Sequence, residues 1–264
     1  MNFKKLLVAA SIIATTSTAS AALTAINGSG LQYGLNSLTQ GSLFLDVNTE
    51  QEFHDATWEV SSLDGSVNQL LFEFAAFKNI AKFGIYDVFD ESKKLEIYAG
   101  NSCGSAEVNC MPDYSLSTLR YFANSHGFEA TTESSNFGSS SIVNSEIFTS
   151  ARFGYYLDSG GGVFYSKKSL NTDSGSLPAS DQMVAIRGDN TTQIDVTGGN
   201  DYTTFSSSQY ILAWEDIKTQ WSDKDYADFV ILVDSVTAVP EPATLAFLGL
   251  GLAGLGIARR KRKS

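Results

Sequence analysis

The sequence predicts an all-β protein that folds as a single antiparallel β-sandwich or jelly-roll-like domain. Short apolar or alternating runs are separated by Gly, Ser, Asn and Asp, which is the pattern typical of sandwiches and barrels. The chain has only four prolines, so few positions break a strand outright. The central part of the chain lacks a long apolar stripe with a helical period.

The expected strands are short and spread over the whole central region. They lie at 42–47, 57–60, 69–76, 83–88, 95–99, 152–157, 162–165, 183–186, 193–196, 210–214 and 229–236. A short helix is expected over 116–123. The polar segments 124–150, 171–180 and 197–208 are predicted to be long surface loops of one domain.

Two segments contain a similar aromatic–glycine pattern. Phe83-Gly84-Ile85-Tyr86 opens a predicted hairpin that turns at residues 90–92 and returns through 95–99. Phe153-Gly154-Tyr155-Tyr156 repeats the pattern later in the chain. A glycine inside a strand indicates a bulge or a close backbone contact, and we expect one or the other in both segments.

The N-terminal residues have the order of an export signal. Lys4 and Lys5 precede an apolar run at 6–14, and Ala19-Ser20-Ala21 fits a small-residue cleavage site. The sequence therefore predicts a signal peptide at 1–21 and an exported β-sandwich-like domain at 22–238.

The C-terminal residues 239–264 form a second signal. Pro240-Glu241-Pro242 is followed by an apolar run at 243–258 and by five consecutive cations at 259–263. As a helix the apolar run would be about 24 Å long, which is short for a bilayer core of about 30 Å. We expect a short transmembrane helix that holds the chain in the inner membrane transiently, with the cations on the cytoplasmic side.

This order of motif, apolar helix and basic end resembles the PEP-CTERM sorting signal of Gram-negative bacteria. The resemblance implies that an exosortase-type enzyme cuts the chain near the motif and that the body reaches the cell surface or the extracellular matrix. An ordinary C-terminal membrane anchor is the alternative.

A second resemblance begins at 210–216, which ends in Trp214-Glu215-Asp216. Asp223, Asp225, Tyr226 and Asp228 follow in an acidic, aromatic segment. The pair of segments is similar to the end of an uncharacterised β-domain often found directly before PEP-CTERM tails. The resemblance implies a β-sandwich-like module on exported proteins and no settled activity.

The predicted body is strongly acidic. Without the two ends it retains 11 basic and 28 acidic residues, a net charge of −17. Such a surface repels nucleic acid and anionic lipid and attracts divalent cations. High charge also serves solubility alone. We expect no nucleic-acid partner.

Five carboxylates lie within fourteen residues, and we hypothesise that they bind Ca²⁺, which takes six to eight oxygen ligands. They are Glu215, Asp216, Asp223, Asp225 and Asp228. The spacing is not that of an EF-hand, which would need Asp or Asn at Ala227 and Gly at position 228. Asp87 or Asp90 would complete the shell from the predicted hairpin. A solvated acidic loop without a site is the alternative.

The two cysteines, Cys103 and Cys110, are predicted to form a disulfide because the body is exported. The bridge would close a small loop and stabilise the fold by roughly 2 kcal/mol. A metal site is the alternative, but the two histidines, His54 and His126, lie outside any ligand-spaced motif.

No catalytic constellation stands out, so we expect a non-enzymatic surface or matrix protein. The segment 100–104 matches G-x-S-x-G, but no helix or suitable triad follows it. A carbohydrate-binding module of the exopolysaccharide matrix is the alternative, with Trp221 as the stacking residue. A secreted hydrolase is a second alternative, because a glycosidase needs only two carboxylates.

Overall fold

The computed structural model describes residues 23–41, 45–61, 65–72, 80–99, 116–133, 141–171, 180–218 and 220–240. The predicted signal peptide, both cysteines, the segment 100–104 and the tail beyond Pro240 lie outside the described residues. Among the helices that are described, none has both the length and the apolar character needed to cross a membrane.

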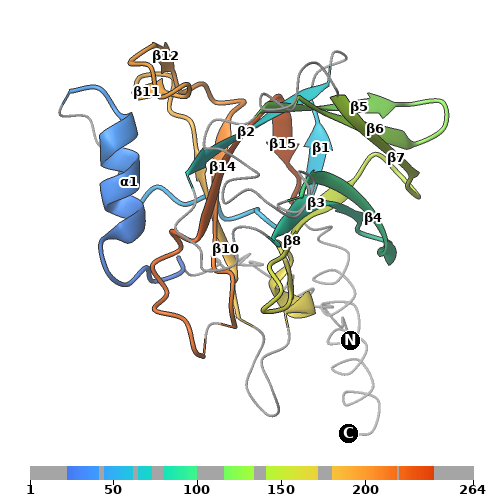
Figure 1. Cartoon of the computed structure of the whole chain (residues 1–264), viewed down its shortest axis with the longest axis horizontal. Coiled ribbons are helices and arrows are strands. Elements are labelled where there is room, and N and C mark those ends of the chain that lie inside the picture. Colours follow the sequence, from blue (N-terminus) through green and yellow to red (C-terminus); the bar gives the residue numbers. More distant parts are fainter. Residues whose placement is uncertain are drawn as a thin grey trace, which may run out of the picture.

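The fold is all-β, as predicted, and is built from two antiparallel sheets (Figure 1). The smaller sheet has the order β15–β1–β8–β3–β4, with β9 paired to β8. Its strands are β1 (Trp58–Val60), β3 (Lys82–Asp87), β4 (Asp90–Ala99), β8 (Phe153–Asp158), β9 (Val163–Tyr165) and β15 (Val236–Ala238).

The larger sheet has the order β10–β13–β14–β2–β5–β6–β7. Its strands are β2 (Ser66–Phe72), β5 (Leu116–Phe122), β6 (Gly127–Glu133), β7 (Ser141–Ile147), β10 (Met183–Arg187), β13 (Tyr210–Trp214) and β14 (Phe229–Asp234). A hairpin of β11 (Gln193–Asp195) and β12 (Tyr202–Thr204), a helix α1 (Gly30–Leu38) and a 3₁₀ turn η1 (Lys168–Leu170) complete the described elements.

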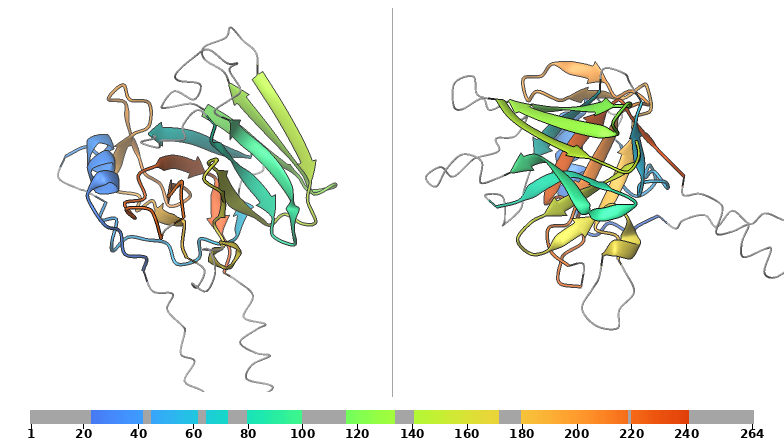
Figure 2. Two further views of the ribbon diagram at one scale, coloured as in Figure 1. Left: turned by 60° about the horizontal axis from the view of Figure 1, so that its bottom comes forward. Right: turned by 90° about the vertical axis from the view of Figure 1, so that its right-hand side faces the viewer.

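The two sheets pack face to face over an aromatic-rich core. Phe83 of β3 lies at its centre and stacks on Tyr155 of β8 at 5.5 Å and on Phe229 of β14 at 5.4 Å between ring centroids. Such contacts join strands from both sheets. The end of the larger sheet formed by β6 and β7 also lies against β4 (Figure 2). There Asn144 Nδ2 donates to the Glu96 carbonyl at 3.1 Å. The sandwich arrangement follows from these contacts.

A second apolar cluster covers the opposite face of the larger sheet. Leu31, Leu35 and Leu38 of α1 pack there with residues of β10, β13 and β14, and the β11–β12 hairpin closes the same side (Figure 1). Residues 210–214 and 229–233 are therefore buried on both faces. This explains why both strands are continuous apolar runs without alternation.

The two aromatic–glycine segments are neighbours in the smaller sheet. They pair antiparallel, so that Gly84 lies opposite Tyr156 and Gly154 lies opposite Tyr86. A Cβ at Gly154 would lie 2.3 Å from the Tyr86 ring, and a register shift occurs at Gly84. The predicted bulge and close contacts are confirmed.

The helix expected over 116–123 is wrong, because β5 occupies this segment. Ser117 and Leu119 are buried while Leu116, Thr118 and Arg120 are exposed. This period of two fits a strand with one covered face. A short amphipathic run does not by itself separate the two structures.

Several further expectations are corrected. The predicted loop at 197–208 contains β12, and the turn predicted at 90–92 lies at 88–89 because β4 begins at Asp90. The predicted loop at 124–150 contains β6 and β7, whose polar Thr, Ser and Asn residues form full ladders with their neighbours. Residues 45–47 of the strand predicted at 42–47 are not in a strand, and Leu45 and Val47 pack in the second cluster instead.

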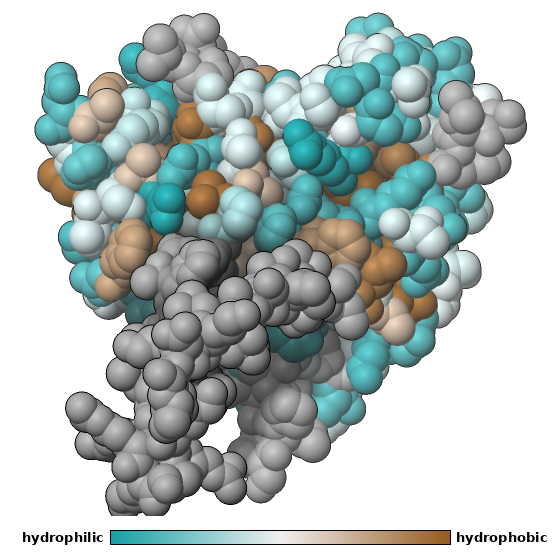
Figure 3. Space-filling model, turned by 180° about the vertical axis from the view of Figure 1, so that it is seen from behind, coloured by the Kyte–Doolittle hydropathy of each residue, from teal (hydrophilic) through white to brown (hydrophobic). Residues whose placement is uncertain are grey.

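The exposed large apolar residues of the described chain are distributed over several elements. On the rear face, apolar residues lie in small areas interrupted by hydrophilic side chains (Figure 3). The most exposed large apolar side chains among the described residues are Tyr33, Trp221 and Phe89. Single exposed aromatics are common, so each needs a second observation before a role is assigned.

Candidate metal centre

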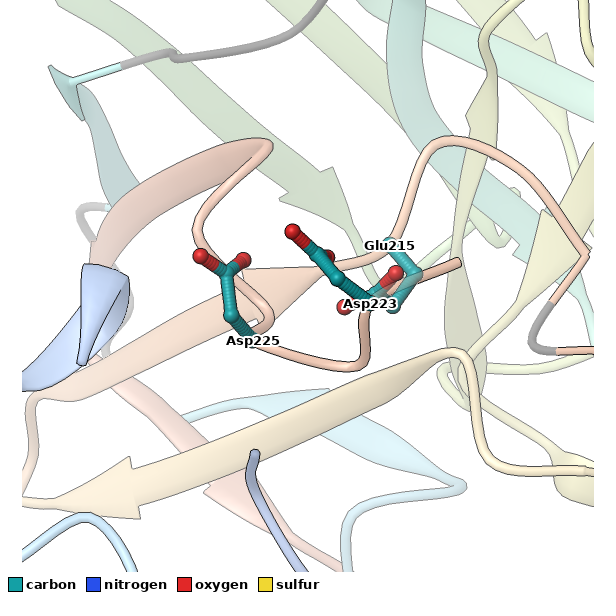
Figure 4. Close-up of side chains that lie close together, drawn as sticks. All are labelled: Glu215, Asp223 and Asp225. Carbon is teal, nitrogen blue, oxygen red and sulfur yellow. The ribbon is translucent and has the colours of Figure 1, made fainter. Parts of the chain in front are cut away.

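The loop that joins β13 to β14 brings three carboxylates together. Glu215 follows the last residue of β13, and Asp223 and Asp225 come from the loop itself (Figure 4). One oxygen from each carboxylate lies within 4.8 Å of the others. Among the described residues this is the one group of His, Cys, Asp or Glu with metal-ligand spacing.

The backbone of the loop turns sharply on either side of Asp225. Lys224 and Tyr226 have φ values of 61° and 54°, in the left-handed region that non-glycine residues seldom adopt. Asp225 Oδ1 also accepts the Ala227 N–H at 2.9 Å, which closes a local turn. These turns direct the Asp223 and Asp225 carboxylates toward Glu215.

Glu215 is the buried member of the group. It is 0% exposed, and its backbone N–H donates to the Gln182 carbonyl at 3.0 Å. Its Oε1 accepts the Tyr226 N–H at 2.7 Å, whereas its buried Oε2 has no hydrogen-bond partner among the described residues. Buried polar atoms are nearly always paired, so this oxygen is an exception among the buried polar atoms of the loop.

Burial, with a contribution from neighbouring charges, raises the pKa of two of the three carboxylates. Burial raises the pKa of Glu215 to about 7, and the charges of Asp228 and Asp223 add to the rise. The Ser222 hydroxyl and the Tyr226 N–H act in the opposite direction. Burial and the charge of Asp223 also raise the pKa of Asp225. A cation between these groups would favour their charged forms.

The N-terminal segment supports the site from a distant part of the sequence. The Asn27 N–H donates to the Lys224 carbonyl at 2.8 Å. A Cβ at Gly30, the first residue of α1, would lie only 2.1 Å from Asp225 Oδ2. Sequence reasoning missed this contact, since nothing in 27–30 signals a partner nearly two hundred residues away.

Two of the predicted ligands lie beside the three-carboxylate group without joining it. Asp228 Oδ2 accepts the Asp216 N–H at 3.0 Å, which links the two ends of the loop. Burial raises the pKa of Asp228, while its hydrogen bonds with Asp216 lower it. Asp216 is itself buried. The pair thus holds the loop closed behind Glu215, Asp223 and Asp225.

Asp87 and Asp90, the two carboxylates expected from the hairpin, accept hydrogen bonds from residues outside the acidic loop. Asp87 is buried and accepts the N–H groups of Phe89 and Thr149, and Asp90 accepts from Ser92. Neither Asp87 nor Asp90 belongs to the three-carboxylate group. Asp87 instead fixes the β3–β4 turn to the segment after β7.

Trp221 lies on the same loop as the carboxylates and is 68% exposed. The backbone N–H of Trp221 donates to the Lys218 carbonyl at 2.8 Å, and Lys218 Nζ lies 6.0 Å from the centre of the indole ring. Trp58 and Trp214 are fully buried in the core between the sheets. Trp221 is therefore the tryptophan available to a ligand, as expected.

The histidines take no part in this group. His54 is exposed, and His126 Nδ1 lies 2.7 Å from the Tyr121 hydroxyl at the β5–β6 turn. The candidate site therefore consists only of carboxylate oxygens.

Comparison with known families assigns the C-terminal half of the chain. Residues 134–236 match a domain of unknown function (DUF4114), a range that contains β7 to β14 and the carboxylates of the loop between β13 and β14. Residues 238–263 match the PEP-CTERM protein-sorting motif. No curated protein and no solved structure matches the chain.

The sorting motif indicates a secreted protein that an exosortase-type enzyme processes, with a destination at the surface or outside the cell. Both resemblances inferred from the residues are confirmed. The chain thus carries a match to the PEP-CTERM protein-sorting motif at 238–263, and the preceding residues 134–236 are similar to a domain of unknown function (DUF4114).

Proposed function

We propose that the protein is a non-enzymatic component of the cell surface or extracellular matrix, and that Ca²⁺ bound between Glu215, Asp223 and Asp225 stabilises its β-sandwich. One observation carries the proposal. The fully buried Glu215 carboxylate has an oxygen without a partner, in a group of three carboxylates whose oxygens lie within 4.8 Å of one another.

The ligand chemistry favours Ca²⁺ among common cations. All three side chains offer hard oxygen, and Zn²⁺ sites usually include Cys or His, which this group lacks. Mg²⁺ demands near-ideal octahedral geometry, whereas Ca²⁺ accepts irregular shells. A loop that turns at Lys224 and Tyr226 provides such an irregular arrangement.

The position of the site explains why a cation would stabilise the whole fold. The loop joins β13 to β14, which are central strands buried on both faces. It also contacts α1 through Gly30 and the preceding segment through Asn27. Without a cation, repulsion among the carboxylates opposes this arrangement, so binding to the folded state raises its stability.

Thermal unfolding of the purified protein tests the proposal. At a free Ca²⁺ concentration of about 100 times Kd, the free energy of unfolding should rise by about 2.7 kcal/mol relative to EDTA. Asp223→Asn combined with Asp225→Asn should abolish the rise. Asp201→Asn, at an exposed carboxylate before β12, should retain it. An unchanged melting temperature in millimolar Ca²⁺ would overturn the proposal.

A further inference from the structure

A cation in this site would keep several coordination positions open. Glu215 Oε1 and Asp225 Oδ1 already accept backbone N–H groups, so the three carboxylates have at most about four other oxygens to offer, whereas Ca²⁺ takes six to eight. Glu215 is buried and Asp225 is half-buried, but Asp223 is exposed. The unfilled positions therefore face solvent on the Asp223 side, where water or an external ligand can supply oxygen atoms.

An exposed aromatic side chain, Trp221, lies on the same loop as Asp223. Trp221 precedes Asp223 by two residues, so their Cα atoms are at most about 7 Å apart. The Trp221 and Ser222 N–H groups both donate to the Lys218 carbonyl, which fixes the turn that carries the ring. Ser222 in turn contacts the Glu215 carboxylate. Trp221 and the three carboxylates thus belong to one loop that is held by these hydrogen bonds.

The charge of the surroundings selects the class of ligand. Three carboxylates around one Ca²⁺ leave a net negative site, and the whole chain has a formal net charge of −11 at pH 7. Anionic ligands such as uronates or phosphates are repelled by this field. Neutral hydroxyl groups coordinate Ca²⁺ without that cost, since they are uncharged oxygen ligands.

We infer that this loop binds a neutral polysaccharide in a Ca²⁺-dependent manner, an inference that rests on the calcium site proposed above. Two neighbouring hydroxyl groups of one sugar residue fill open positions on Ca²⁺. The Trp221 indole packs against the apolar face of the same sugar residue or of the next one, where its large, rigid surface adds contact area. The cation provides orientation, and the indole provides most of the buried apolar surface.

Binding of the purified protein to immobilised neutral and uronate-containing polysaccharides, in millimolar Ca²⁺ and in EDTA, tests this inference. We expect binding to neutral polymers in Ca²⁺ and its loss in EDTA. Trp221→Ala should weaken binding on the order of tenfold, as for an aromatic residue central to an interface. Trp221→Phe should restore part of the affinity. Phe89→Ala removes a similarly exposed aromatic from the β3–β4 turn and should leave binding unchanged.

The thermal shift with Ca²⁺ separates the two proposals. If Trp221→Ala retains the shift but loses the polysaccharide, both proposals stand. If the shift is present in wild type and no neutral polysaccharide binds, or Trp221→Ala binds equally well, the polysaccharide inference is wrong while the calcium site remains. Preference for uronate polymers, or binding that survives EDTA, contradicts the inference as well. Absence of the shift itself refutes the calcium site.

Discussion

The backbone N–H of Tyr226 donates a 2.7 Å hydrogen bond to Oε1 of Glu215, across eleven residues of the acidic loop. The Tyr226 side chain is 2% exposed, and its hydroxyl donates to the Asp181 carbonyl at 2.9 Å. Packing of Tyr226 in the second apolar cluster thus fixes the amide that holds Glu215. The carboxylate is oriented before any ligand arrives, which lowers the cost of binding.

Calcium affinity should rise with pH and level off above about pH 7. The pKa of Glu215 is raised to about 7 by burial, so the side chain is largely protonated in the cation-free fold at pH 5 to 6. Ca²⁺ must displace that proton, which weakens binding at low pH. Isothermal titration at several pH values measures the effect, and Glu215→Gln should both weaken binding and flatten its pH profile.

The same carboxylate makes stability in EDTA depend on pH in the opposite direction. Its pKa is about 7 when folded and 4.5 as the ordinary value, so the folded state binds the extra proton between these limits. The contribution of Glu215 is fully present below about pH 4.5 and is lost as pH rises through 7. Denaturant unfolding of wild type against Glu215→Gln isolates this contribution from the other carboxylates. A wild-type-minus-variant difference that is flat from pH 4.5 to 7 would contradict it.

Gly30→Ala should impair the site from the opposite end of the chain. Alanine favours a helix over glycine by up to about 1 kcal/mol, so α1 alone would gain. The added Cβ would instead lie 2.1 Å from Asp225 Oδ2 and displace that carboxylate. We expect a several-fold loss of Ca²⁺ affinity. Gly199→Ala, whose Cβ would meet only Thr197 Oγ1 at 3.4 Å, is the matched control, and equal affinities in the two variants would rule out the contact.

Gly154→Ala should destabilise the smaller sheet by about 1–3 kcal/mol, since overpacking a filled core costs energy of this size. The new Cβ would lie 2.3 Å from the Tyr86 ring, which is fully buried and cannot withdraw. Urea unfolding of Gly154→Ala, Tyr86→Ala and the double variant measures the coupling. If the two changes are additive, the close contact does not limit stability.

Protein recovered outside the cells should lack the basic end at 259–263. The sorting motif at 238–263 predicts cleavage near Pro240 by an exosortase-type enzyme. Intact mass of the secreted form locates the new C-terminus. Replacing Pro240, Glu241 and Pro242 with alanine should trap the uncut chain in the inner membrane. Full-length protein found only in that membrane in wild-type cells would contradict processing.

The sequence predicts best those strands that are continuous runs of apolar residues. Residues 210–214 and 229–233 are uninterrupted apolar runs, and both lie in central strands. The strand predicted at 229–236 ends at Asp234, and Val236 begins β15 in the other sheet. The failures have a common cause. Residues 116–123 and 124–150 contain alternating or polar residues whose strand structure depends on ladders with β2 and with one another. Such pairing depends on partner strands outside each segment, which local propensity does not encode.

The sequence does not predict helix α1, because this helix also depends on tertiary packing. Leu31, Leu35 and Leu38 have helical spacing, but Gly30 and Gly34 weaken a helix in isolation. In the structure both glycines are needed for close approach, Gly30 to Asp225 and Gly34 to the Phe72 ring. The helix forms because it covers the outer face of the larger sheet, and tertiary packing overrides the local cost.

By itself the sequence determined the β class, the sorting motif and the residue types of the candidate site, because composition, order and short motifs express these locally. Only the tertiary structure decided which carboxylates meet. The fold brings the carboxylates of Glu215, Asp223 and Asp225 close together. It also pairs Asp228 with the backbone N–H of Asp216 and places Gly30 beside the Asp225 carboxylate. The reason is geometric: left-handed turns at Lys224 and Tyr226 and the burial of Tyr226 arise from packing, which residue spacing alone does not specify.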